Sequence, residues 1–170
     1  MPVDQRWDAL IIGKSGMLSG SAEVFQRGLI QICREIDGAY FHPDDTGYAG
    51  IDDCVQRTRM TGRAILPIIG HSNGCYFALK VAEKLRISGV QVPMFLFDRT
   101  IKPCPRAGAN VPEVHDVHAE LPIRVKVTDD FHGELVYHDF KYEGHTSVTL
   151  NTKAQALAID FGKRWKAKQQ

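Results

Sequence analysis

Five consecutive residues, Gly70-His71-Ser72-Asn73-Gly74, place one hydroxyl between two glycines. A short apolar run precedes them, and a segment with apolar residues at helical spacing follows. The pattern G-x-S-x-G between a strand and a helix is typical of a nucleophile elbow, a sharp turn that lifts the serine hydroxyl above a sheet. The glycines avoid collisions with the neighbouring strand and helix, and the helix amino terminus favours a developing negative charge. The sequence therefore predicts Ser72 as a nucleophile.

A serine nucleophile needs a base that takes its proton, and histidine is the usual base because its unperturbed pKa is about 6.5. A carboxylate normally orients that histidine. Five histidines follow Ser72 in the chain: His115, His118, His132, His138 and His145. Which of them meets the serine depends on the elements that position it.

Apolar runs and helical periodicity divide the chain into alternating elements. Strands are predicted at 7–13, 39–43, 63–70 and 90–98, in one or two pieces within 113–127, and at 134–142. Helices are predicted from near Ser21 to Gly38, over 51–60 with Gly62 closing it, after the serine turn and at the carboxyl end. The loose alternation at 134–142 indicates a sheet edge. Pro67 lacks the N–H that a central strand needs, which predicts a local bulge.

Strands alternate with helices through the first 98 residues, and several strands are continuous apolar runs. Both features favour a mostly parallel sheet with helices on both faces. The sequence therefore predicts an α/β fold, a three-layer α/β/α sandwich. Its length of 170 residues, without an internal repeat or a boundary, predicts one domain over residues 1–170.

The stretch GHSNGCYFALKVAEKLRISGVQVPMFLFD resembles the core of the α/β-hydrolase superfamily, and of its thioesterase and esterase members in particular. In that branch GHSxG, a helix, a glycine and a strand ending in Asp follow in this order. The resemblance covers residues 8–98, and the remainder fits by the order of its elements. Two departures are visible. Cys75 replaces a second glycine after the motif, and 170 residues leave little room for lids, so a minimal, lidless member is expected.

The resemblance implies the chain order serine, acid, histidine. It implies His145 as the base, in the loop after the last strand, and Asp98 at a strand end as the acid. Asp129 or Asp130, after another predicted strand, is the alternative acid, although little chain separates this pair from His145. His71, inside the elbow, is expected to point away from the reaction, either as a packing residue or as one that supports the catalytic side chains from behind.

Acyl transfer also needs two donors to the oxyanion. The backbone N–H of Asn73, directly after the serine, is the first expected donor. The second is expected from the loop after the first strand, where the backbone N–H of Lys14 or Ser15 is a candidate.

The sequence gives weaker signals for two other kinds of site, a phosphate-binding loop and a metal centre. Gly13-Lys14-Ser15 resembles the end of a phosphate-binding loop, but Asp8 stands where that motif needs a glycine. His115-x-x-His118, with Asp116 and His132, has a spacing that permits a metal without indicating one. The prediction is therefore no cofactor and no metal.

Bulk composition excludes several partners. Lys+Arg 21 against Asp+Glu 20 gives a net charge of +1, so nucleic acid is not expected. The four cysteines are scattered without a CxxC, and neither a signal peptide nor a membrane span is visible, which indicates reduced thiols in a cytoplasmic protein.

The sequence thus predicts a cofactor-independent serine hydrolase acting on a small-molecule or carrier-bound acyl ester or thioester. The alternative is a hydrolase-like binding or scaffold module whose triad is idle. In either case a homodimer would cover the apolar surface that a lidless fold exposes.

Overall fold

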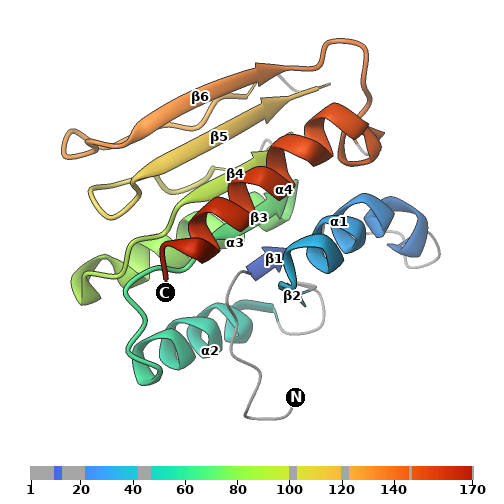
Figure 1. The fold of residues 1–170 in the computed structure, drawn as a ribbon. Coiled ribbons are helices and arrows are strands. Elements are labelled where there is room, and N and C mark those ends of the chain that lie inside the picture. The colour runs from blue at the N-terminus through green and yellow to red at the C-terminus, as the bar shows by residue number, and fades with distance from the viewer. Residues whose placement is uncertain are drawn as a thin grey trace.

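The computed structural model describes residues 10–12, 22–41, 47–99, 103–119, 123–145 and 147–169. Strands alternate with helices up to β4, as predicted (Figure 1). In chain order the elements are β1 (Leu10–Ile12), α1 (Ala22–Ile36), β2 (Ala39–Phe41), α2 (Gly47–Met60), β3 (Ile68–His71), α3 (Asn73–Leu85), a 3₁₀ turn (Arg86–Ser88), β4 (Met94–Phe97), β5 (Glu113–His118), β6 (Glu134–Asp139), a second 3₁₀ turn (Ser147–Leu150) and α4 (Thr152–Ala167).

Within the described residues the strands form one sheet in the order β2-β1-β3-β4-β5-β6. Each neighbouring pair is parallel, so the strands end at a common carboxyl edge (Figure 1). The prediction of a mostly parallel sheet is confirmed, and β6 lies at its edge as expected. The carboxyl edge of such a sheet is where α/β proteins place their ligands.

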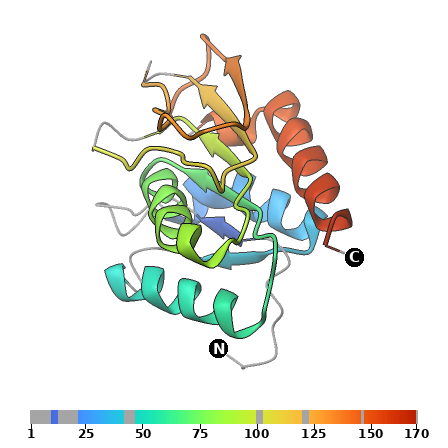
Figure 2. The same cartoon turned by 90° about the vertical axis from the view of Figure 1, so that its left-hand side faces the viewer.

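Two apolar cores lie on opposite faces of the sheet, because successive strand side chains point to opposite sides. Ile68 and Met94 face α2 and α3, whereas Ile69 and Phe95 face α1 and α4. Figure 2 shows α3 and α4 on the two sides of the strands. The predicted three-layer α/β/α sandwich is confirmed. No helix in the described part of the chain is long and apolar enough to cross a membrane.

The connections from β4 to β5 and from β5 to β6 contain no helix in their described parts. They run over the α3 face, where Ala107 pairs with Val127 and Asn110 donates to the carbonyl of Ala82 at 2.9 Å. Extended chain therefore covers part of this face in place of helices, which keeps the protein small.

Buried charges hold the second connection on the sheet. Asp116 accepts a hydrogen bond from the N–H of Val125 at 2.7 Å, and Arg99 donates to the carbonyl of Arg124 at 2.5 Å. These two groups belong to one peptide unit, whose dipole thus lies between a carboxylate and a guanidinium. Arg99 is 6% exposed, so its hydrogen bond is shielded from water.

Three local predictions need correction. α2 begins at Gly47, earlier than the expected 51. The residue with positive φ after α1 is Asp37, at 50°, whereas Gly38 donates to the Cys33 carbonyl and accepts from the Cys33 thiol. Pro67 forms no bulge: it precedes β3, and the donors toward β4 are Leu66 and Ile68 on either side of it.

Candidate active site

The turn between β3 and α3 holds Ser72 in a strained backbone conformation, with φ 55° and ψ −118°. A side chain rarely adopts such a positive φ, which costs on the order of 1–3 kcal/mol and persists only where the surroundings enforce it. Two hydrogen bonds do so: Ser72 N–H donates to Phe97 O at 3.1 Å, and Ser72 O accepts from Cys75 N–H at 3.0 Å. The serine is thereby fixed at the end of β3 and the start of α3.

Close packing explains the glycine before the serine and the cysteine after it. A Cβ on Gly70 would lie 2.9 Å from the carbonyl oxygen of Gly74, which is too close. Cys75 stands where related elbows often have glycine, yet its thiol fits, fully buried, and donates to Phe97 O at 3.5 Å. Burial, reinforced by Asp116, raises the pKa of this thiol, so it remains a protonated donor.

His145 approaches the serine from the loop after β6. Its Nε2 lies 3.0 Å from Ser72 Oγ, and its Nδ1 lies 2.6 Å from Asp98 Oδ2. A carboxylate oxygen only accepts, so Nδ1 carries the hydrogen and Nε2 is free to accept the serine proton. The structure thus brings Ser72, His145 and Asp98 into one hydrogen-bonded chain.

Asp98 follows β4 directly, as the sequence indicates. It is 0% exposed and has a positive φ of 40°. Its N–H donates to Val117 O at 2.7 Å, and its Oδ1 accepts from Ala119 N–H at 2.9 Å. Backbone groups at the end of β5 therefore orient the carboxylate so that Oδ2 faces His145.

A polar network closes the loop that carries His145. Glu143 accepts hydrogen bonds from Asn151 at 2.7 Å and from Ser147 at 2.9 Å. The same Asn151 accepts from Lys153 N–H and Ala154 N–H and so caps α4. Hydrogen bonds from Asn151 and then Ser147 lower the pKa of Glu143. The loop is therefore tied to the first turn of α4.

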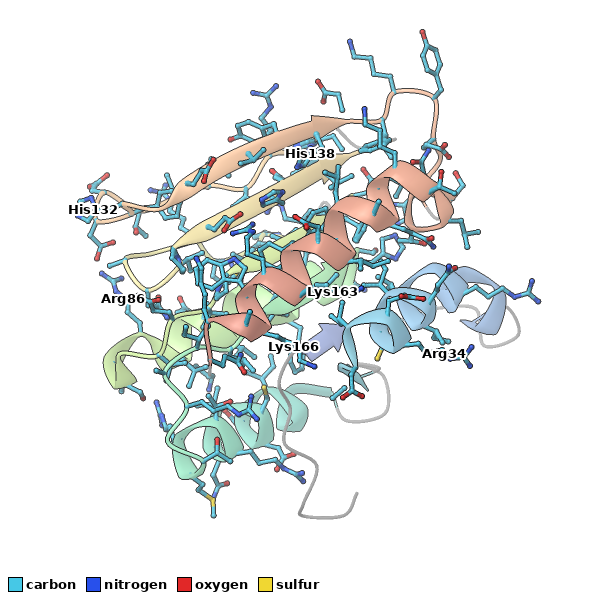
Figure 3. All side chains as sticks on the ribbon, in the orientation of Figure 1. Arg34, Arg86, His132, His138, Lys163 and Lys166 are labelled. Carbon is cyan, nitrogen blue, oxygen red and sulfur yellow. The ribbon has the colours of Figure 1, made fainter. Side chains whose placement is uncertain are left out.

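The alternative acids lie elsewhere. Asp129 and Asp130 precede β6, at the amino edge of the sheet, whereas His145 follows that strand. Asp130 forms an ion pair with Arg86. Figure 3 shows Arg86 and His132 toward one end of the sheet and His138 toward the other end of β6. The structure does not bring either aspartate to Ser72, because the length of β6 separates them.

The expected oxyanion donors are described in part. Asn73 is the first residue of α3, immediately after the serine. Lys14 and Ser15 lie outside the described residues. The register of the sheet pairs Ile12 with Gly70, so β1 ends beside the residue two before Ser72.

The other histidines are away from the serine. His115 and His138 join through a hydrogen bond of 2.9 Å on neighbouring strands, and His115 also contacts Glu113 at 2.7 Å. His118 lies 3.2 Å from Asp116, and His132 is exposed in the turn before β6. Among the residues that the structure describes, no group of three or more His, Cys, Asp or Glu side chains is arranged so that it could hold a metal ion.

His71 packs and supports the site, as expected, but the sequence did not identify its partner. Its Nε2 lies 2.7 Å from the carbonyl oxygen of His145. The two rings are 5.0 Å apart between centroids and tilted by 37°. The alternation of side chains along a strand could have indicated this contact. It puts His71 on the same face of the sheet as Ile69, toward the helix that follows the His145 loop.

No protein-family model matches the sequence, and no curated protein matches it. Two solved structures with similar folds are informative. The Vlm2 thioesterase domain aligns with 88% of this chain and 89% of its own, at a TM-score of 0.54 and 13% identity. A Xanthomonas campestris pv. campestris protein, assigned as a hydrolase of the α/β superfamily, aligns with 95% of this chain and 99% of its own, at a TM-score of 0.53 and 19% identity. The chain therefore has the fold of the α/β hydrolases.

Proposed function

We propose that the protein is a serine hydrolase that cleaves carboxylic ester or thioester bonds through Ser72, His145 and Asp98. The observation that carries this proposal is the hydrogen-bonded chain from Ser72 Oγ through both ring nitrogens of His145 to Asp98, with distances of 3.0 and 2.6 Å. Nucleophile, base and orienting acid are then each within reach of the next.

The chemistry proceeds in two steps. Ser72 Oγ attacks the acyl carbon while His145 Nε2 takes its proton, and the imidazolium gives that proton to the leaving alcohol or thiol. Water, activated by the same nitrogen, then attacks the acyl-enzyme and releases the acid. Asp98 keeps the hydrogen on Nδ1 and stabilises the imidazolium.

The oxyanion formed in both steps needs backbone donors. We assign the first to Asn73 N–H, at the amino end of α3, where the helix dipole also favours negative charge. The second is assigned to Lys14 or Ser15 in the loop after β1. The pairing of Ile12 with Gly70 supports this assignment, because that loop begins at the same edge as the serine.

The substrate class follows from the chemistry and from one similar structure. An acyl carbon bound to oxygen or sulfur suits this nucleophile, and the Vlm2 domain is a thioesterase. We therefore propose a small-molecule or carrier-bound acyl ester or thioester, with no cofactor. A series of esters and thioesters that share one acyl group distinguishes the two leaving groups by kcat/KM.

A fluorophosphonate probe tests the proposal directly. Wild type, Ser72→Ala and the control Ser88→Ala are labelled, and the adduct is located by peptide mass spectrometry. Ser88 is a matched control because it accepts a hydrogen bond from Arg59 in the turn after α3, at the opposite end of this helix from Ser72. An adduct on Ser72 in wild type and Ser88→Ala, absent from Ser72→Ala, supports the proposal. A folded wild-type protein without adduct contradicts it and favours an idle binding module, which a partner search and the oligomeric state would then examine.

A further inference from the structure

His71 lies at the last position of β3, beside the nucleophile. Along this strand Gly70 faces α3, and Ile69 belongs to the opposite core, toward α1 and α4. His71 shares the direction of Ile69 because strand side chains alternate. The chain segment that carries His145 enters α4 on that same side. The side chain of His71 is therefore directed at the loop between β6 and α4 that carries His145, the base loop, rather than at the acyl group.

The contact between the two histidines has a defined donor. A carbonyl oxygen can only accept, so His71 Nε2 carries a hydrogen and donates it to His145 O at 2.7 Å. His71 is 1% exposed, which shields the hydrogen bond from competing water. The neighbouring rings, 5.0 Å apart, also pack against each other.

Hydrogen bonds among its own residues also hold the base loop. Glu143, Ser147 and Asn151 tie its ends to α4, but these hydrogen bonds do not include His145 itself. The imidazole has to satisfy Ser72 and Asp98 at once, and its side chain is 19% exposed. A displacement of about 1 Å from such a geometry can cost about 100-fold in rate. The bond from His71 fixes the backbone of the residue on which this geometry depends.

We propose that His71 is a positioning residue, whose Nε2–H donor holds the backbone of His145 so that its imidazole spans Ser72 and Asp98. The inference rests on the proposed hydrolase function for its kinetic consequence. His71 itself does not need to touch the substrate. Its effect is expected in kcat and in the reactivity of Ser72, with KM nearly unchanged.

Two substitutions separate the donor from the ring. His71→Phe keeps an aromatic ring and removes the donor, whereas His71→Gln keeps an N–H at similar reach and removes the ring. We expect His71→Phe to lower kcat and the rate constant of fluorophosphonate labelling by on the order of 10-fold or more. His71→Gln should recover most of both. Equal rates in His71→Phe and wild type, or equal losses in both variants, would overturn the assignment to the hydrogen bond.

Proton NMR provides a readout that needs no turnover. The hydrogen between His145 Nδ1 and Asp98, in a 2.6 Å bond, should give a strongly downfield resonance, assigned by its loss in His145→Gln. It should persist in His71→Gln and weaken or vanish in a folded His71→Phe. Persistence in both overturns the inference. If wild type shows this resonance but neither labelling nor turnover, the proposed function fails while the positioning role is still decided by the spectrum.

Discussion

Two of the carboxylate–imidazole pairs described on this sheet are short: Asp98 with His145 at 2.6 Å and Glu113 with His115 at 2.7 Å. The first pair continues to a serine hydroxyl at the carboxyl edge. The second continues to another imidazole, His138, between the sheet and α4. Proximity of a carboxylate and a histidine is therefore common to a candidate site and to a packing contact, and the surroundings distinguish them.

The second pair is tied to cations and to a helix. Arg164 and Trp165 of α4 donate to Glu113, so the carboxylate anchors that helix on β5. Burial alone would raise the pKa of Glu113, but hydrogen bonds from Arg164, His115 and Trp165 outweigh it and lower the pKa to about 2. Burial and the neighbouring His115 lower the pKa of His138, which keeps that ring neutral. The Glu113 cluster therefore stabilises the packing of α4 on the sheet, and it contains no nucleophile.

The first pair lies on strained backbone. Ser72 and Asp98 have φ of 55° and 40°, and the other non-glycine residue with positive φ in the described chain is the helix-ending Asp37. Glu113 and His115 belong to a regular strand. Strain at two members of one hydrogen-bonded chain indicates that the fold sacrifices local stability to place them, which is typical of functional sites.

The largest expected effect is on turnover. Asp98→Asn should lower kcat by about 10⁴-fold, because the amide favours the wrong tautomer of His145. Glu113→Gln and Asp130→Asn should leave kcat per folded molecule nearly unchanged. Steady-state kinetics with active-site titration check all three. A severe Asp130→Asn with a mild Asp98→Asn would reverse the assignment of the acid.

The next effect is on stability. Glu113→Gln should cost about 3 kcal/mol at pH 7, since a pKa lowered from 4.5 to about 2 corresponds to that much differential interaction. The folded pKa lies below the unfolded one, so this contribution is present above about pH 4.5 and is lost as the pH falls toward 2. Urea titrations of both proteins at several pH values measure it. A destabilisation that does not shrink in acid would contradict the ionic explanation.

A smaller loss of stability is expected for a substitution in the turn that carries Ser72. Gly70→Ala brings a Cβ to 2.9 Å from Gly74 O and 3.0 Å from Cys75 N, so backbone must move, at a cost of about 1–3 kcal/mol. The matched control is Gly108→Ala, because the nearest atom to a Cβ at that position is the Thr128 hydroxyl oxygen, at 3.4 Å. Thermal unfolding should separate the two variants, and labelling of Ser72 should slow in the first alone.

The smallest effect concerns strain. Ser72→Gly should be more stable than Ser72→Ala by about 1 kcal/mol, because glycine adopts φ 55°, ψ −118° without a Cβ clash. The comparison is made between two inactive variants, so activity does not enter. If the alanine variant is equally or more stable in urea, the backbone of Ser72 is not strained. Backbone strain would then no longer distinguish the candidate site from the Glu113 cluster.

Local patterns allowed much of the fold and the order of the site to be predicted. The elbow, the strand ending at Asp98 and the loop carrying His145 follow from short stretches and from the resemblance. Properties that depend on register did not follow. The His115–His138 bond depends on how β5 and β6 align. Asp129 and Asp130 are candidates because a strand is expected directly before them, but 123–127 is not a strand of the sheet and makes an isolated bridge from Val127 to Ala107. The contact from His71 to His145 joins residues 74 positions apart.

Asn151 caps α4 and also holds Glu143, so the first helical turn and the base loop share one residue. Opening of that turn therefore removes the tie between the His145 loop and α4 without unfolding the sheet. Helix ends open far more readily than central strands, and their amide hydrogens exchange accordingly. We expect the amides of Lys153 and Ala154 to report the fraction of molecules in which the His145 loop is no longer tied to α4. On this basis, reversible loss of activity on heating should begin below the temperature at which the parallel sheet melts.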